Sequence, residues 1–333
     1  MRGPLRRLIL TARAAIVVAA LPIPASTLLY GQTTAPAFVG VRTFLGAPYV
    51  PRLETIEADF AVLGVPFDEG TWGQPGARYG PRDLRENSQE YHFYLTEGFY
   101  YIDQDRTVLK GKRWVDAGDV EVFPTVPVQT GEKVTAAVRT ILGRKALPIV
   151  IGGDHSITFP VLRAYQSPLT LIHFDAHLDT WNAAPGNLDH SSWVNRTAAL
   201  PHVRKVVQVG MRGLANDQEA MGNARKIGST IITSEQIHRK GAAWALSRIP
   251  ASERIYVTVD VDVLDPSVAP GTGTIEPDGL SFAELDDLLK GLPAKGRLVG
   301  LDVVEITPYR DPSGRTAQTA VRLIIDLLGA AFP

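Results

Sequence analysis

The chain has 333 residues, of which 45% are hydrophobic and 21% are charged. This composition is typical of a globular protein, and the length allows one large or two ordinary domains. The formal net charge is −1, and no basic cluster is interleaved with aromatic residues, which argues against a nucleic-acid partner. The absence of cysteine excludes disulfides, thiolate zinc sites and cysteine nucleophiles.

The N-terminus has the composition of a targeting segment. Residues 1–53 contain six arginines and no acidic residue, and an apolar stretch at 14–21 follows the first four arginines. This order is that of a secretory signal, and Arg6-Arg7 is similar to a twin-arginine export signal. The apolar stretch is too short for a stable membrane span. A mitochondrial transit peptide and a disordered tail are the alternatives.

These features divide the chain into a targeting peptide at 1–31, an N-terminal extension at 32–53 and one folded domain at 54–333. No linker, repeat or low-complexity segment follows residue 53. We therefore expect an exported protein, periplasmic or secreted, with the mitochondrion as the alternative location.

The remainder of the chain alternates between strand and helix patterns. Eight apolar runs predict strands near 59–65, 113–117, 147–152, 169–175, 204–210, 229–233, 254–261 and 297–305. Most of these runs are continuous, which favours strands buried on both faces of a parallel sheet. Helices are expected at 131–144, at 281–290 with a capping box from Ser281 to Glu284, and at 315–329. The alternation predicts an α/β fold with three layers and right-handed crossovers.

Three acidic motifs follow three of these strands, at 152–156, 175–179 and 260–266. Ligands of such sheets bind beyond the carboxyl ends of the strands, which is where all three motifs are expected. Their carboxylates would repel one another without cations to neutralise them. The alternative is a polar strand face that simply meets water, but the residues leading into the motifs are apolar. The sequence therefore predicts a site for divalent metal, with room for two ions.

The histidines differ in their neighbours. His155 and His177 lie within the acidic motifs, whereas His173 lies deeper in its strand and is expected to pack beside the site rather than bind metal. His92, His202 and His238 have no acidic companions in the sequence and receive no role. A site rich in oxygen, with two imidazoles and no sulfur, suits manganese-type ions better than structural zinc.

At these motifs the chain resembles the ureohydrolase family of arginase, agmatinase and their relatives, over roughly residues 50–330. The resemblance implies a three-layer αβα sandwich around a mainly parallel eight-stranded sheet, with 54–333 as the catalytic domain. It also implies two Mn²⁺ ions per subunit, with Ni²⁺ or Co²⁺ accepted by the same ligands, and a homo-trimer or hexamer. The implied ligands of one ion are His155, Asp175, Asp179 and Asp260, and those of the other are Asp175, His177, Asp260 and Asp262. Asp265 would fix the adjoining loop rather than bind metal.

The resemblance also assigns the chemistry. Glu305 would pair with the guanidinium of a small guanidino substrate, agmatine or a guanidino acid, while metal-bound hydroxide attacks the guanidinium carbon to release urea and an amine. Asp179 and the loop residue His190 would move the proton to the leaving amine. The alternatives are a related C–N hydrolase of formimino or acetylamino compounds on the same metal pair, and an inert exported binding protein.

Within the family the agmatinase branch fits best, through the segments at 64–70, 75–81 and 269–274. One departure concerns the segment His190-Ser191-Ser192, where family members usually carry a glycine after the histidine. The change lies beside the expected substrate tail and leaves every expected metal ligand in place.

Overall fold

The computed structural model describes residues 39–183 and 189–333, so the predicted targeting peptide at 1–31 lies outside the described residues. Eight strands form one sheet: β1 (Phe60–Val65), β4 (Trp114–Asp119), β5 (Leu147–Gly152), β6 (Leu169–Phe174), β7 (Val203–Met211), β8 (Thr230–Thr233), β9 (Arg254–Asp260) and β10 (Arg297–Val304). All eight predicted strands are thereby confirmed. A short antiparallel hairpin, β2 (Phe99–Tyr101) and β3 (Arg106–Val108), was not expected.

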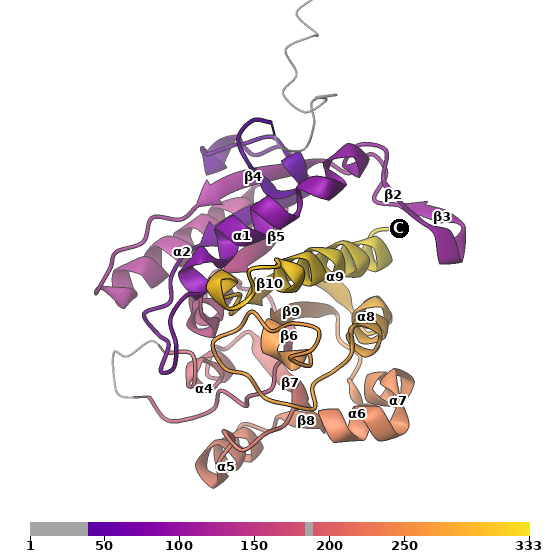
Figure 1. Ribbon diagram of the computed structural model, residues 1–333. Coiled ribbons are helices and arrows are strands. Elements are labelled where there is room, and N and C mark those ends of the chain that lie inside the picture. Colours follow the sequence, from indigo (N-terminus) through magenta and orange to yellow (C-terminus); the bar gives the residue numbers. More distant parts are fainter. Residues whose placement is uncertain (1–38, 184–188) are drawn as a thin grey trace, which may run out of the picture. The chain divides into compact units, whose positions relative to one another are not determined.

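The sheet has the strand order β4-β1-β5-β10-β9-β6-β7-β8 (Figure 1). Every pairing within it is parallel, as the continuous apolar runs predicted. In this order β5 and β6, which are consecutive in the chain, are separated by two strands. These two strands, β9 and β10, come later in the chain and lie between them. The strand order therefore reverses at the centre, which is where open parallel sheets bind ligands.

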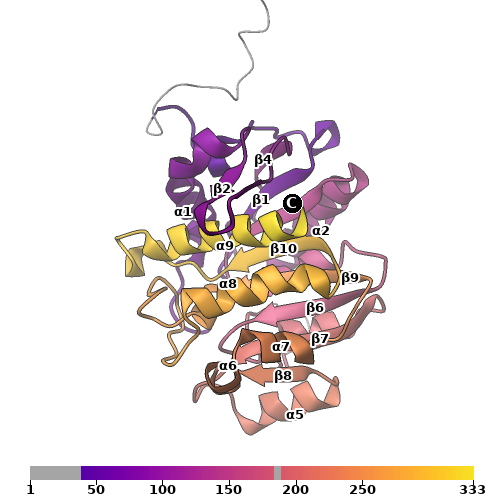
Figure 2. The same cartoon turned by 90° about the vertical axis from the view of Figure 1, so that its right-hand side faces the viewer.

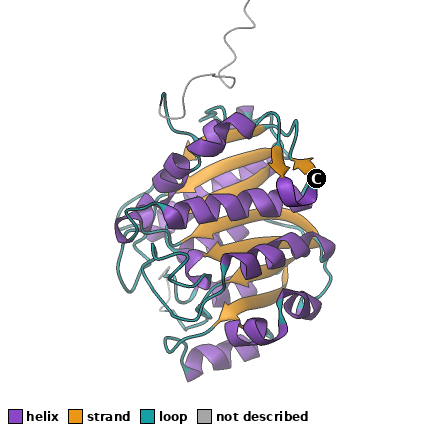
Figure 3. Ribbon diagram, turned by 45° about the vertical axis from the view of Figure 1, so that its right-hand side comes forward, coloured by secondary structure: helices purple, strands orange, loops and turns teal. Residues whose placement is uncertain are grey.

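Nine helices are present in the described residues: α1 (Gly80–Asn87), α2 (Pro127–Gly143), α3 (Thr158–Leu162), α4 (Trp193–Ala198), α5 (Gln218–Lys226), α6 (Ser234–Lys240), α7 (Ala242–Arg248), α8 (Phe282–Gly291) and α9 (Arg315–Ala331). Residues of α1, α6, α7, α8 and α9 share one apolar cluster with one face of the sheet. Residues of α2, α3 and α4 share a second cluster with the opposite face. Figure 2 shows α8 and α9 in front of the sheet, running roughly along the strands, and Figure 3 shows helices in front of and behind the strands. The three-layer prediction is confirmed.

The local patterns explain these elements. In β9, Val257 and Val259 belong to one core cluster and Tyr256 to the other, so the strand is buried on both faces. The predicted capping box is present at the start of α8, where Ser281 and Glu284 satisfy each other's backbone amides.

Part of the segment predicted as an N-terminal extension is packed against the sheet. Phe44 and Leu45 are fully buried. The Phe44 amide donates to Asp116 Oδ2 at 2.7 Å, and the Leu45 amide donates to Ser88 Oγ at 2.8 Å. These residues therefore contribute to the same core as α1 and β4.

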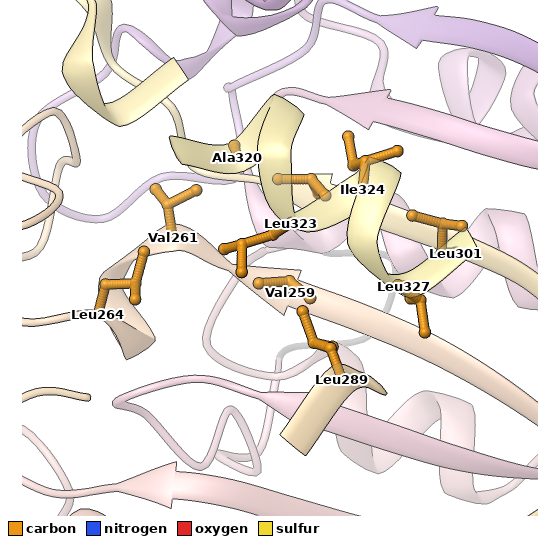
Figure 4. Close-up of a pocket in the computed structure, with 10 residues that line it drawn as sticks. Val259, Val261, Leu264, Leu289, Leu301, Ala320, Leu323, Ile324 and Leu327 are labelled. Carbon is orange, nitrogen blue, oxygen red and sulfur yellow. The ribbon is translucent and has the colours of Figure 1, made fainter. Parts of the chain in front are cut away.

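The core between β9, β10, α8 and α9 leaves a small apolar gap of about 10 Å³ (Figure 4). Val259, Leu301 and Leu327 are among its lining residues. Such a volume holds at most one water molecule, and an apolar lining offers water no partner. The gap is a packing feature and not a ligand site. Within the described residues, no helix is long and apolar enough to cross a membrane.

Leu327→Ala should lower the free energy of unfolding by about 2–5 kcal/mol, because it enlarges this gap in a core that cannot collapse freely. Leu214→Ala is the matched control, since Leu214 is 98% exposed and Leu327 only 1%. Chemical denaturation of both variants measures the difference. Equal stability of the two variants would contradict the described packing.

Candidate active site

The acidic motifs meet at the carboxyl ends of four adjacent strands, β5, β10, β9 and β6. The register aligns these ends, because Val304 of β10 pairs with Asp260 of β9, and Val259 pairs with Phe174 of β6. The motif at 152–156 turns sharply after β5. A Cβ atom at Gly153 would overlap the backbone of Phe67, so this turn requires glycine.

Asp175 occupies the centre of the site and faces both motif histidines. Its Oδ2 lies 2.9 Å from Nδ1 of His155, and its Oδ1 lies 3.3 Å from Nδ1 of His177. The two oxygens of one carboxylate thus point to two imidazoles. Two groups of side chains in this cluster could hold a metal ion, one around His155 and one around His177, and Asp175 belongs to both.

Each imidazole is also close to further carboxylates. His155 Nδ1 lies 3.5 Å from Asp179 Oδ2 and 3.3 Å from Asp260 Oδ2. His177 Nδ1 lies 3.1 Å from Asp262 Oδ2. The structure therefore brings all six expected ligands together. Asp260 contacts the His155 side of the cluster, and its other oxygen accepts the Asp262 amide at 2.8 Å.

The donor set fits a divalent cation. The buried Nδ1 of His155 makes no hydrogen bond within the described residues, although three carboxylate oxygens surround it. A bound cation would coordinate this nitrogen, which has no hydrogen-bond partner, together with the carboxylate oxygens that face it. The sequence-based expectation of a metal site thus agrees with the chemistry of the residues present.

The electrostatics of the cluster lead to the same conclusion. Burial, followed by the charge of Asp175, raises the pKa of Asp179 well above its usual value. Burial, followed by the charges of Asp262 and Asp175, raises the pKa of Asp260 in the same way. Burial also opposes ionisation of Asp175, but the charges and hydrogen bonds of the neighbouring histidines outweigh it and hold its pKa well below the usual range. These carboxylates cannot all ionise together without added positive charge.

His173 supports the cluster from deeper in β6. Its Nε2 lies 2.8 Å from Asp175 Oδ2, and its Nδ1 lies 3.3 Å from Nε2 of Gln208. His173 also belongs, with His155, Asp175 and Asp179, to a group of side chains that could hold a metal ion, so its expected packing role stays a prediction.

The orientation of His155 depends on two residues that the sequence did not identify as functional. The Nε2 atom of His155 lies 2.8 Å from Thr258 Oγ1, and this hydroxyl donates to Asp302. The other oxygen of Asp302 accepts from Tyr256 at 2.7 Å and from Thr158 at 3.0 Å. A fully buried carboxylate thus fixes the hydroxyl that positions the imidazole.

Glu305 and His190 adjoin the cluster and contact each other. Glu305 follows β10, and its Oε1 accepts the His155 amide at 2.9 Å. His190 Nδ1 lies 2.9 Å from the same oxygen. Glu305 has a φ of 65° and Asp179 a φ of 50°, a left-handed conformation that is uncommon for such residues and recurs at functional sites.

A loop after β1 covers these two residues. The Trp72 amide donates to His190 Nε2 at 3.1 Å, and the His190 amide donates to the Gly70 carbonyl at 3.0 Å. Asp154 joins the same loop, because its Oδ2 accepts the Gly70 amide at 2.7 Å. Burial and then the charge of Glu305 raise the pKa of Asp154 to about 7. Sequence reasoning gave Asp154 no role of its own, because its partner lies 84 residues away.

Asp265 and the three remaining histidines of the sequence analysis lie outside the cluster. Asp265 accepts the Ser267 amide at 2.9 Å and the Gly279 amide at 3.2 Å, so it fixes its loop as expected. The expectation that His238 lacks acidic companions was wrong. Its Nδ1 lies 2.8 Å from Glu284 Oε1, because the fold places α8 beside α6. His92 and His202 contact backbone carbonyls.

The contact between His190 and Glu305 predicts a titration. Burial lowers the pKa of His190, but Glu305 outweighs it and raises that pKa from 6.5 to about 9. Below pH 6.5 His190 is therefore fully protonated and pairs with Glu305, and this pairing is lost as the pH rises through about 9. The protonated ring carries a hydrogen on Nε2, so it gives up the Trp72 amide, which donates to Nε2 only in the neutral form. In metal-free protein, Glu305→Gln should bring the His190 pKa down toward 6.5 or below.

NMR titration of the imidazole signals measures this change, with His238 as the internal control. The pKa of His238 is raised by Glu284 and should not respond to the Glu305 substitution. An unchanged His190 titration in the Glu305→Gln variant would contradict the described contact.

Comparisons with known proteins agree with this geometry. The sequence matches the arginase family over residues 58–329. It is 34% identical over 316 residues to an agmatinase of Chromobacterium violaceum, covering 90% of this chain and 91% of that protein. It is 32% identical to a mitochondrial guanidino acid hydrolase of Homo sapiens, covering 90% and 86% of the two chains.

Solved structures give the same result. A hypothetical agmatinase from Burkholderia thailandensis superposes with a TM-score of 0.79 and 32% sequence identity, covering 93% of this chain and 96% of that chain. The parallel eight-stranded sheet, the buried cluster of histidines and aspartates and these similarities lead to one conclusion: the chain belongs to the arginase family, on its agmatinase-like branch.

Proposed function

We propose that this protein hydrolyses a guanidinoalkyl compound, agmatine or a guanidino acid, to urea and an amine on a pair of divalent metal ions. The observation that carries the proposal is the position of Asp175 between His155 and His177, with the carboxylate of Glu305 beside them. The cluster supplies ligands for two cations, and Glu305 supplies a separate anionic group for the substrate.

The metal ions would be held by the clustered side chains. Ligands of the first ion would be His155, Asp175, Asp179 and Asp260, and ligands of the second Asp175, His177, Asp260 and Asp262. Four carboxylates balance the charge of two divalent ions, and the N and O donors suit Mn²⁺, with Ni²⁺ or Co²⁺ as substitutes. Such a pair would supply the Lewis acidity that activates water as a nucleophile near neutral pH.

Glu305 would hold the guanidinium. Its carboxylate is 2% exposed and contacts the His155 amide and the His190 ring, so its position is fixed before substrate binds. A planar guanidinium binds a carboxylate through two parallel hydrogen bonds. This contact would place the guanidinium carbon at the cluster, and pre-placed charge lowers the barrier for attack on a resonance-stabilised carbon.

Asp179 and His190 would move the proton that the leaving amine needs. The Trp193 indole donates to Asp179 Oδ2 at 2.8 Å and fixes that carboxylate at the edge of the cluster. His190 is the most solvent-accessible of the site histidines, with a side chain that is 13% exposed. An imidazole between the buried cluster and solvent is suited to pass a proton outward.

The substrate tail would lie over the loop that carries His190. The related proteins are named as an agmatinase and a guanidino acid hydrolase, so a cationic and an anionic tail are both represented among them. In this chain Ser191 bonds Asp189 through its amide at 3.1 Å and its hydroxyl at 2.7 Å. These contacts shape the loop in place of the usual glycine.

The substrate proposal is tested by urea release from agmatine, arginine, guanidinobutyrate and guanidinopropionate with added Mn²⁺. We expect urea from at least one of the non-arginine compounds. Glu305→Gln should lower kcat/KM by a factor of about 100 or more, because a neutral amide loses the charge-assisted pair. Glu235→Gln is the matched control, because it removes the same charge from a side chain of α6 that is 65% exposed. No urea from any compound would refute the proposal.

The metal proposal predicts a role for Thr258 that is separate from chemistry. Thr258→Val removes the hydroxyl between His155 and Asp302 but keeps a side chain of similar size and shape. This variant should bind Mn²⁺ about 10- to 100-fold more weakly. Thr170→Val, on the neighbouring strand β6, removes a buried hydroxyl that bonds Ser252 instead and should leave Mn²⁺ binding unchanged. Calorimetric Mn²⁺ titration of the metal-free variants compares them. Equal Mn²⁺ affinities for the two variants would contradict the positioning of His155 by Thr258.

Export and a homo-trimer or hexamer are further parts of the proposal, the first resting on the N-terminal sequence and the second on the resemblance to the family. Export is supported by the arginines and the apolar stretch of the first 31 residues. The mass of the mature N-terminus tests it, since retention of residue 1 would exclude cleavage of a targeting peptide.

A further inference from the structure

A second cleft lies at the edge of the sheet opposite the candidate active site. Its volume is about 790 Å³. Its walls come from the amino ends of β1, β5, β9 and β10 and from the segments that precede these strands. Because the strands are parallel, their amino ends lie away from the acidic motifs at their carboxyl ends (Figure 1). The cleft is therefore separate from the metal cluster.

The cleft has a strongly positive lining. Five cationic side chains and one carboxylate line it, namely Lys112, Arg139, Lys145, Arg254, Arg297 and Asp59. The chain as a whole has a net charge of −1, so this concentration does not reflect a basic composition. A cleft lined by one sign of charge focuses the electrostatic field and raises the local concentration of counter-ions.

Most of these cations have no internal partner. Within the described residues, Arg139, Lys145 and Arg297 form no ion pair, and Arg254 lies 3.4 Å from the exposed Glu253. Asp59 is engaged by Arg113, whose amide donates to it at 2.8 Å. Arg139, Lys145 and Arg297 are solvent-exposed, so they are free to contact an anion that enters the cleft.

Apolar side chains line the cleft as well, among them Leu298, Val299 and Phe332. Nζ of Lys112 lies 5.8 Å from the centre of the Phe332 ring, and the Tyr165 hydroxyl donates to the Val299 carbonyl at 3.1 Å. The volume falls within the range of about 300–1,000 Å³ that is typical of small-molecule sites.

We propose that this cleft binds a small organic phosphate with an apolar body and at least two negative charges, as in a nucleotide. Leu298, Val299 and Phe332 would contact the body, and Arg139, Lys145 and Arg297 would contact the phosphates. Several cations around one cleft call for more than one negative charge, which a phosphorylated compound supplies and a single carboxylate does not. One bounded cleft of this size suits a small molecule better than a nucleic-acid strand.

The test is calorimetric titration of the manganese-loaded protein with adenosine 3′,5′-bisphosphate, and separately with adenosine and with inorganic phosphate. We expect one bisphosphate per chain, with an affinity that decreases as salt is raised, and weaker binding of each fragment. The double variant Arg139→Gln/Arg297→Gln should weaken bisphosphate binding about tenfold or more. Urea release by this variant should not change, because both residues lie at the far edge of the sheet.

The matched control is Arg225→Gln/Lys226→Gln, which removes the same charge from exposed positions of α5. This control should bind the bisphosphate as the wild type does. No binding by the wild type, equal binding by the Arg139/Arg297 variant, or an equal loss in the α5 variant would overturn the proposal. A change in oligomeric state caused by the Arg139/Arg297 variant alone would overturn it too, because the cleft would then be an interface between copies.

Discussion

The mutual repulsion of buried carboxylates is the constraint on which the rest of this site depends. Asp175, Asp179, Asp260 and Asp262 are each at most 6% exposed, and the parallel sheet brings them to one point at its reversal of strand order. Burial alone favours their neutral forms, as the raised pKa values of Asp179 and Asp260 show. Only positive charge within the cluster allows all of them to remain ionised. The fold thus creates one site that strongly favours the binding of cations.

The surrounding residues fix the geometry of that place. Asp302 fixes Thr258, which fixes His155, and all three of these residues are buried from solvent. On the other side, Glu305 bonds both the His155 amide and the His190 ring, so the group proposed to hold substrate is connected to a ligand candidate. A change in the loop that carries His190 would therefore alter the position of the Glu305 carboxylate. The residue proposed to hold substrate and a residue proposed to hold metal are thus joined by one hydrogen bond.

Much of this could be predicted from local sequence patterns. Strand positions followed from continuous apolar runs, and the start of α8 followed from Ser281 and Glu284, because both signals act within a few residues. The contact of Thr258 with Asp302 could not be predicted, since it depends on the register that pairs these two residues across β9 and β10. The strands of the β2–β3 hairpin are too short to show a recognisable alternation of apolar and polar residues. The burial of Phe44 and Leu45 likewise depends on distant partners, Asp116 and Ser88.

In the proposed function, Asp175 would be a ligand of both metal ions. Anomalous diffraction from crystals grown with Mn²⁺ tests this most directly. We expect two peaks per chain, both within bonding distance of Asp175, and the loss of both in the Asp175→Asn variant. A single peak, or two peaks of which one does not contact Asp175, would contradict the account.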